Sequence, residues 1–258
     1  MRVLFLGDIV GQPGVEMVRK SLPTLRAVEH LDCVVANAEN ASGGSGMTPR
    51  VYRQLREAGI DLITMGDHIY KKLELVKILE EESCICKPAN FPNEAPGSSI
   101  IFTTLADGTV IAVFCLLGRT FMRPVDCPFQ AADQVLATLA GRAQIIVVDV
   151  HAEATADKIL LGHHLKGRVA AVLGTHTHVQ TADEQILPGG TAFITDVGMT
   201  GPYDSVLGRR IDRVLHTTMT FVPTQFDVAE GDPRLAGAIV DCDPANGQAQ
   251  AIRRVMLD

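Results

Sequence analysis

The strongest constraint on the fold is an alternation of short β-rich runs with helix-like segments along the first half of the chain. The β-rich runs read RVLFL, CVVANA, IDLITM and CICKP. Thr48 and Pro49 are a typical N-cap and first-turn pair, and Gly59 is a typical residue after a helix. This alternation indicates a layered α/β sheet. The expected helices lie at residues 14–28, 49–58 and 70–82.

The second half of the chain is richer in strand-like segments. SIIFTTL and TVIAVFCLL flank the Asp107-Gly108 pair, which predicts a hairpin turn. One helix is expected at residues 129–141, ahead of QIIVVDV. The C-terminal part is interpreted as strands separated by turn clusters, namely TAFITDV, HTTMTFV, QFDVAE, AGAIVDC and QAIRRVML. We therefore expect an α/β fold of two packed mixed β-sheets flanked by helices, in a single domain over residues 1–258.

Composition and charge exclude several classes of protein. The chain is 47% hydrophobic and 21% charged, as in an ordinary globular protein. Its net charge of −7 argues against broad binding of nucleic acids or anionic membranes. A small phosphorylated ligand stays compatible, because a bound metal reverses the charge of a pocket. The six cysteines contain no C-x-x-C pair, and neither a membrane-spanning run nor a signal-peptide pattern occurs. We expect a soluble cytoplasmic protein with reduced thiols, whose oligomeric state stays open, a homo-oligomer included.

Potential metal ligands stand at the ends of five of the strand-like runs. In open α/β sheets, ligands bind in the crevice outside the carboxyl ends of the strands. We therefore expect side chains that are far apart in the sequence to converge on one site. In chain order they are Asp8, Glu39 with Asn40, Asp67 with His68, His151, and His176 with His178.

The chemistry of this set is coherent. Carboxylate, amide and imidazole ligands suit manganese, iron, zinc or cobalt, and the absence of thiolates argues against a structural zinc site. Two divalent ions that share so few ligands need one bridging carboxylate, and such a pair, about 3.5–4 Å apart, can clamp both oxygens of a phosphoryl displacement. A loop after the strand would let His176 and His178 each address a different ion.

Several motifs together resemble the YmdB-like phosphodiesterase family of the calcineurin-like metallophosphoesterase superfamily. They are GDIVG, NAEN, GDH, DVHAE, GTHTHVQTAD, LLGRTFM and ITDVGMTGPYDSVLG, which span the chain from its first residue to about residue 210. The resemblance implies an α/β/β/α sandwich and two divalent ions, iron or manganese first, with zinc, cobalt or magnesium as alternatives. It also implies hydrolysis of small phosphodiesters, with 2′,3′-cyclic nucleotides as the favoured substrates, through attack by a metal-bridging hydroxide.

The resemblance also assigns roles to individual residues. Glu39 would bridge the two ions, and His68 would be the catalytic histidine beside them. Asp67 departs from the family pattern, which usually has asparagine in the G-N-H motif where this chain has GDH. Arg119, in LLGRTF, would contact the substrate phosphate or form a structural ion pair. One ion would take Asp8, Glu39, Asn40 and His178, and the other Glu39, Asp67, His151 and His176.

Two other functions stay open at this level. A dinuclear amidohydrolase would use the same ions on a carbonyl carbon, and a carboxylated lysine or a barrel of β/α repeats would favour it. A non-catalytic module could sense a nucleotide through a metal-bound phosphate site. The glycine-rich residues 43–46 lack the P-loop pattern, so we expect them to let the backbone pass close to the metals or to form a mobile rim.

Overall fold

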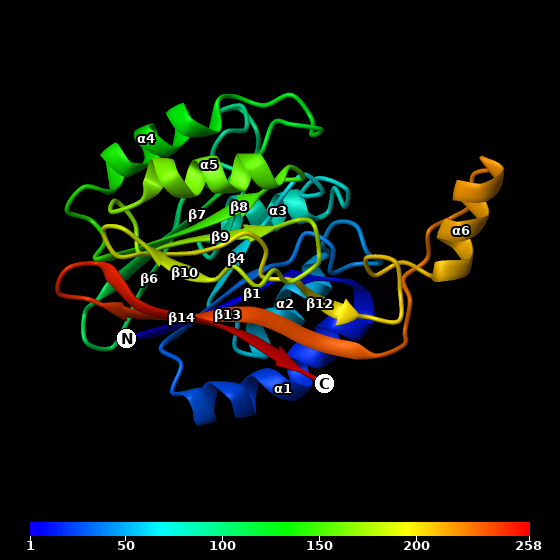
Figure 1. Cartoon of the computed structure of the whole chain (residues 1–258), viewed down its shortest axis with the longest axis horizontal. Helices are drawn as coiled ribbons and strands as arrows, with labels where there is room; N and C mark the ends of the chain where they lie inside the picture. The colour runs from blue at the N-terminus through cyan, green and yellow to red at the C-terminus, as the bar shows by residue number, and fades with distance from the viewer.

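Two mixed β-sheets pack against each other in the computed structural model, which describes residues 1–258 (Figure 1). The first sheet contains β1 (Arg2–Leu6), β2 (Asp8–Ile9), β3 (Cys33–Asn37), β4 (Leu62–Thr64), β5 (Ile85–Cys86), β12 (Met199–Pro202), β13 (Pro233–Asp243) and β14 (Gln248–Leu257). Its strand order is β2-β12-β13-β1-β3-β4-β5, and β14 pairs with β13. The neighbours from β1 to β5 are parallel, whereas β13 runs antiparallel to β1.

The second sheet has a parallel centre and antiparallel edges. Its strands are β6 (Ile101–Thr104), β7 (Val110–Leu117), β8 (Ile145–His151), β9 (Ala171–Thr175), β10 (Gln185–Leu187) and β11 (Thr191–Ile194). They follow the order β10-β11-β9-β8-β7-β6, in which β7, β8, β9 and β11 are parallel. The edge strands β6 and β10 run antiparallel to their neighbours. Both sheets therefore deliver several parallel strand ends to the same side of the fold.

Helices cover the outer face of each sheet (Figure 1). The covering helices are α1 (Gly11–Glu29), α2 (Pro49–Glu57), α3 (Leu75–Glu81), α4 (Pro128–Leu139) and α5 (Thr155–Leu165). A sixth helix, α6 (Ile211–Thr220), covers neither sheet. The first three pack on the first sheet, and α4 and α5 pack on the second. This arrangement confirms the predicted fold class, an α/β/β/α sandwich.

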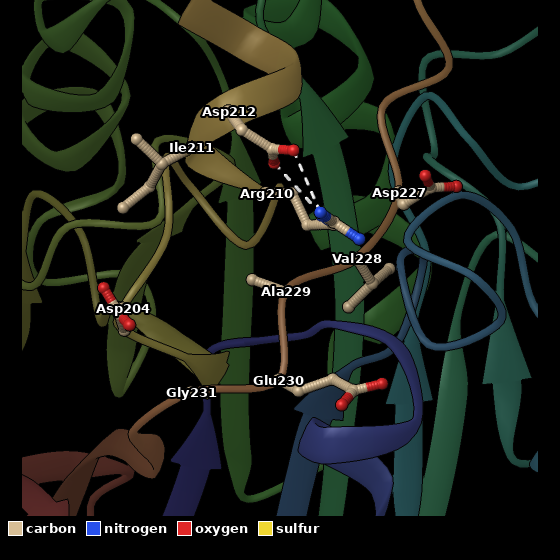
Figure 2. A pocket seen from close by; sticks show the side chains of 9 residues that line it. All are labelled: Asp204, Arg210, Ile211, Asp212, Asp227, Val228, Ala229, Glu230 and Gly231. Carbon is tan, nitrogen blue, oxygen red and sulfur yellow. Dashed lines mark hydrogen bonds and ion pairs between the residues drawn. The ribbon is translucent and has the colours of Figure 1, made fainter.

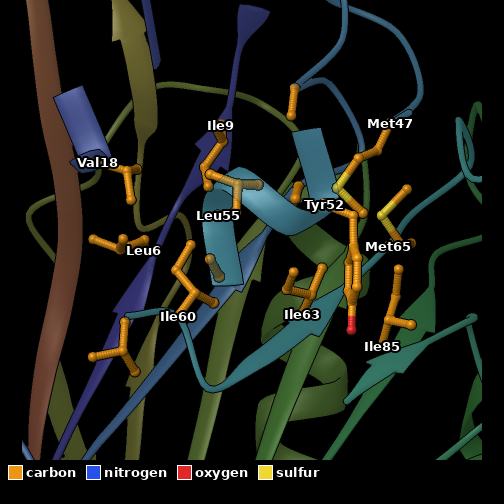
Figure 3. Close-up of a cluster of buried hydrophobic side chains, with 14 of the residues drawn as sticks. Leu6, Ile9, Val18, Met47, Tyr52, Leu55, Ile60, Ile63, Met65 and Ile85 are labelled. Atoms are coloured by element: carbon orange, nitrogen blue, oxygen red, sulfur yellow. The ribbon is translucent and has the colours of Figure 1, made fainter. Parts of the chain in front are cut away.

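The core has three hydrophobic layers, one between the sheets and one under each set of helices. Strand β1 shows how the sequence builds two of them, since Leu4 and Leu6 point toward the helices while Val3 and Phe5 point toward the other sheet. Figure 3 shows the layer under α1 and α2, which includes Leu6. A strand buried on both faces has little freedom, so the residues that follow it are held in fixed positions.

Most predicted elements are present. Thr48 caps α2 by accepting a hydrogen bond from the Val51 amide, and Pro49 is the first helical residue. The hairpin around Asp107-Gly108 is formed by β6 and β7. The third predicted helix is shorter than expected, because residues 67–74 form turns and bends and α3 begins only at Leu75.

Two strand predictions near the C-terminus were wrong. HTTMTFV lies mostly in α6, where Ile211, Leu215 and Met219 recur at the spacing of a helix face. The β-branched threonines of this stretch had favoured a strand, but the Thr220 hydroxyl donates to the His216 carbonyl four residues earlier, as helices allow. QFDVAE forms no strand, and only an isolated bridge joins Val228 to Arg209.

Residues 206–226, hereafter the arm, carry α6 at their centre, and α6 projects away from the sandwich (Figure 1). No side chain of α6 is buried. Apolar side chains of the arm such as Leu215, Met219 and Phe221 are largely exposed. None of the helices combines the length and the apolar character that a membrane span requires. All six cysteines are free thiols.

Candidate metal centre

The structure brings all seven predicted ligands to the carboxyl ends of strands from both sheets. Asp8 follows β1, Glu39 and Asn40 follow β3, and Asp67 lies in the turn after β4. His151 is the last residue of β8, and the segment after β9 carries His176 and His178. The site thus lies where the ends of the parallel strands meet, as the sequence predicts for an α/β sheet.

Four of these side chains form one tight group. Ligand atoms of Glu39, Asp67, His151 and His176 all lie within 4.8 Å of one another. His151 Nε2 is 3.3 Å from Glu39 Oε1, 3.4 Å from Asp67 Oδ1 and 3.0 Å from His176 Nδ1. Atoms that surround one ion at about 2.0–2.2 Å must themselves be about 3 Å or more apart. The four residues therefore fit the ligand shell of a single divalent ion, and they are the set that the family resemblance assigns to one ion.

The other predicted set lies beside this group. His178 Nε2 is 3.8 Å from Asp8 Oδ1 and 3.3 Å from the amide nitrogen of Asn40. Asn40 also donates to Glu39 Oε1 at 3.2 Å. Glu39 therefore contacts members of both sets, which is the position that a bridging carboxylate would need.

Among the predicted ligands, two buried carboxylate oxygens have no hydrogen-bond partner, one in each set. They are Asp8 Oδ1 and Asp67 Oδ1. An orphaned buried oxygen of this kind carries a desolvation penalty unless it contacts a cation or a donor. Their presence beside two histidine nitrogens fits the donor chemistry of divalent metals.

Each histidine ligand has its second nitrogen engaged outside the cluster. Such outer partners fix the ring orientation and direct the other nitrogen at a metal. The three pairs are His151 Nδ1 with the Thr175 hydroxyl at 2.9 Å, His178 Nδ1 with the Leu207 carbonyl at 3.0 Å, and His176 Nε2 with the Glu153 carboxylate at 3.2 Å.

Asp149 anchors the outer partners of His151. It is fully buried between the sheets and accepts hydrogen bonds from the Thr175 hydroxyl at 2.6 Å and the Asn37 amide at 3.0 Å. Because the Thr175 hydroxyl donates to Asp149, it accepts from His151 Nδ1, which leaves His151 Nε2 facing the cluster. Asp149 was not predicted from the sequence, although a carboxylate inside the apolar run QIIVVDV indicates a buried charge that needs partners.

A buried ion pair shapes the segment that carries the two histidines. His176 and His178 both have positive φ angles, 90° and 63°, which is strained for these residues. Between them, Thr177 donates through its hydroxyl to Asp196 Oδ2 at 2.6 Å. Lys158 Nζ donates to the same oxygen at 2.9 Å, and both partners are almost fully buried. This anchor holds the turn that lets two histidines one residue apart face the same site.

Neighbouring histidines offset the negative charge of the clustered carboxylates. Although burial opposes it, His151 and His68 hold the pKa of Glu39 well below its usual range. Burial raises the pKa of Asp8 to about 6. Burial would lower the pKa of His151, but Glu39 and Asp67 raise it well above the usual value. The clustered carboxylates therefore favour a positive charge at the centre of the group, which is the charge that a divalent ion supplies.

His68 lies at the edge of the cluster and outside the four-residue group. Its backbone amide donates to Glu39 Oε2 at 2.9 Å, and its Nδ1 lies 2.7 Å from the Asn40 side-chain oxygen. The ring Nδ1 also lies 3.3 Å from Glu39 Oε1, and this side-chain contact raises the pKa of His68 above its usual value. The ring is therefore oriented and poised to carry a proton beside the ligands.

A cavity of about 540 Å³ opens over the cluster. Its polar lining includes Glu39, Asn40, His68, His176 and His178. A second cavity, of about 480 Å³, lies at the base of α6 and contains none of the predicted ligands (Figure 2). The cavity over the cluster, hereafter the cluster pocket, is therefore the candidate substrate site.

Arg119 does not line this pocket, and neither does the pair of consecutive histidines, His163 and His164. The Arg119 side chain is exposed, its backbone amide donates to Asp157 at 2.9 Å, and it does not line the cluster pocket. Its role toward substrate stays a prediction. His164 is on α5 and pairs with Asp133 at 3.0 Å on the surface, as expected for a solvated histidine.

The sandwich of two mixed sheets is the fold of a metallophosphoesterase, a class that uses divalent metals, and the cluster at its strand ends is a candidate site for such metals. A family model described as YmdB-like protein matches residues 4–255. This chain belongs to the YmdB-like family.

Individual relatives match the chain over its whole length. The 2′,3′-cyclic-nucleotide 2′-phosphodiesterase of Bacillus subtilis (strain 168) is 45% identical over 258 residues, which covers 100% of this chain and 97% of the relative. The crystal structure of a hypothetical protein from Thermus thermophilus has a TM-score of 0.94 and 40% identity, and covers 100% of this chain and 99% of that one. A novel phosphatase from Mycoplasma pneumoniae has a TM-score of 0.93 and 29% identity, with coverages of 100% and 93%.

Proposed function

We propose that this chain is a metal-dependent phosphodiesterase that hydrolyses 2′,3′-cyclic nucleotides with the help of two divalent ions. The observation that carries the proposal is the pair of ligand sets that meet at Glu39, each with an orphaned buried carboxylate oxygen. The substrate class is supported by the Bacillus subtilis relative, which is 45% identical over the whole chain. The six free cysteines are consistent with a cytoplasmic enzyme.

The residues would divide between the two ions, with Glu39 shared. Asp8, Asn40 and His178 would complete one site, and the other would be completed by the group that contains His151. When bound, divalent ions of this kind polarise phosphoryl oxygens and lower the pKa of water. Iron or manganese suits the mixed oxygen and nitrogen ligands, with zinc, cobalt or magnesium as alternatives.

His68 would supply a proton to the oxygen that leaves the phosphorus. Its Nδ1 proton is engaged by Asn40, so a protonated ring holds its second proton at Nε2. The ring lines the cluster pocket, which places it within reach of a bound diester. Asn40 and Glu39 would therefore orient the acid while they also serve as ligands.

No observation favours either alternative function. The sheets are open and form no β/α barrel, and the buried Lys158 is engaged by Asp196 and Thr177, so it is not a metal-bridging carboxylated lysine. A pure sensor would have no need for the oriented His68 beside the ligands.

The proposal is tested by assaying metal-loaded protein with manganese, iron, zinc, cobalt and magnesium on a substrate panel. The panel holds 2′,3′-cyclic AMP, 3′,5′-cyclic AMP, bis-p-nitrophenyl phosphate and an anilide as an amidohydrolase substrate. We expect metal-dependent turnover of the diesters, with 2′,3′-cyclic AMP preferred. Turnover of the anilide alone, or nucleotide binding with no turnover of any diester, would refute the proposal.

A further inference from the structure

The cluster pocket has an apolar part that metal-assisted hydrolysis does not require. Besides the predicted ligands and His68, the lining includes Val10, Gly44, Glu153 and Thr177. The remaining wall consists of four apolar side chains and one guanidinium, namely Val206, Leu207, Val214, Phe226 and Arg209. All five belong to the arm, which contributes no carboxylate or amide side chain to the lining. A phosphodiester group is polar and charged, so an apolar wall beside its binding site must serve another part of the substrate.

Phe226 is the feature of this wall that points to a ligand. It is the only phenylalanine, tyrosine or tryptophan in the pocket lining, and 41% of its surface is exposed. Val214 from the first turns of α6 and Leu207 line the same cavity. An exposed aromatic ring beside aliphatic side chains offers a flat surface on which a nucleobase stacks.

The position of Phe226 is fixed relative to the metal ligands by Arg209. The Arg209 guanidinium donates to the Phe226 carbonyl at 2.9 Å, to the Gly43 carbonyl at 3.1 Å, and also to the Gly44 carbonyl. Gly44 has a φ of 79°, and a Cβ at this position would clash with the guanidinium. Gly44 therefore makes room for an arginine that ties the arm to the loop after Glu39.

The size of the pocket suits a mononucleotide. Its volume of about 540 Å³ lies inside the range of about 300–1,000 Å³ that small-molecule sites occupy. The ligand cluster and the apolar residues line one continuous cavity, so a ligand with a phosphate at one end and an aromatic base at the other can contact both.

We propose that Phe226, together with Val214 and Leu207, forms the base-binding subsite of the enzyme and stacks on the nucleobase of the substrate. The inference rests on the proposed function, because it assumes a nucleotide whose phosphodiester lies at the metal ligands. Stacking is available to every base, and the arm offers no amide or carboxylate to read a base edge. The subsite should therefore accept purines and pyrimidines alike while discriminating against substrates that lack a base.

Binding can be tested without turnover, because the chain contains no tryptophan. Phe226→Trp introduces a single fluorescent reporter into the subsite, and Phe221→Trp introduces one at a position of the arm that is 89% exposed and outside the pocket lining. Titration with adenosine 3′-monophosphate should give saturable quenching in the first variant and none in the second. Equal responses in both variants, or no response at position 226, would overturn the inference.

Kinetics separate this inference from the proposed function. The substrates are 2′,3′-cyclic AMP and methyl riboside 2,3-cyclic phosphate, which lacks a base. In Phe226→Ala, we expect the ratio of kcat/KM for the first substrate to that for the second to fall about tenfold, as expected for a lost base–aromatic stack. Phe221→Ala should leave both values unchanged. If wild-type enzyme hydrolyses both substrates and Phe226→Ala leaves the ratio unaltered, the base subsite is wrong, whereas wild-type enzyme that hydrolyses neither would overturn the proposed function and the inference with it.

Discussion

The cluster pocket has two walls that the chain builds in opposite ways. On the ligand wall, Glu39 is fully buried at the end of a core strand, and so are Asp8 and His151 of the same cluster, which do not reach the pocket surface. The arm wall belongs to a segment whose helix buries no side chain, and Leu215 and Met219 of that helix are largely exposed. Groups that need fixed geometry are thus packed into the core. The wall assigned to the base instead depends on a few hydrogen bonds from Arg209.

The largest effect is expected on the ligand wall at its shared residue. Glu39→Gln keeps the shape of the side chain but removes a charge that both ions would share. Bound metal and diesterase activity should fall together. The loss of activity should exceed the 10²–10⁴-fold that loss of a general acid costs. Metal analysis and kinetics on the same preparation provide the test, and a variant that keeps two ions and full activity would exclude a bridging role.

His68→Ala tests whether a residue beside the ligands acts on the chemistry alone. We expect metal content to stay unchanged while kcat for 2′,3′-cyclic AMP falls about 10²–10⁴-fold, the usual contribution of a general acid. The loss should be smaller for bis-p-nitrophenyl phosphate, because its leaving group needs no proton. Equal losses on both substrates would assign charge stabilisation to His68, and loss of an ion would make it a ligand.

A smaller effect is expected at the position that departs from the family pattern. Asp67→Asn removes one negative charge from the four-residue group, so that the ion there should bind more weakly but polarise substrate more strongly. Activity at saturating metal should stay within about an order of magnitude, with a changed order of preferred metals. Complete loss of one ion would show that the Asp67 charge is indispensable.

The smallest effect is expected on the arm. Leu215→Ala removes an exposed side chain and should change the free energy of unfolding by no more than about 0.5 kcal/mol. The matched change Leu6→Ala, in a fully buried strand beside the ligands, should cost about 2–5 kcal/mol. Denaturant unfolding of the two variants measures both values. A comparable loss in Leu215→Ala would mean that the arm is packed against something in solution.

The ligand wall could be predicted from sequence because each ligand directly follows a β-rich run. The rule that parallel strand ends meet then places Asp8, Glu39 and His151 together without knowledge of the sheet order. The groups that hydrogen-bond the second nitrogen of each histidine ligand were harder to predict from sequence. The Leu207 carbonyl that orients His178 has no side-chain signal at all.

The arm could not be predicted, for a physical reason. Its threonines favour strands by propensity, and its apolar residues at positions 211, 215 and 219 are too few to outweigh that preference without tertiary contacts. Phe226 lies in a stretch with no regular structure, so nothing in the local pattern connects it to a site that begins near residue 8. Only the folded chain shows that the two regions line one cavity.

The number of metal ions per chain tests most directly whether two ligand sets meet at Glu39. Wild-type protein, His176→Ala and His178→Ala are loaded with manganese, dialysed and measured for ions per chain. We expect two ions in the wild type and about one in each single variant, because His176 and His178 lie in different sets. The variant that combines His176→Ala with His178→Ala should retain almost none. A single ion per wild-type chain, or two ions retained in both single variants, would contradict it.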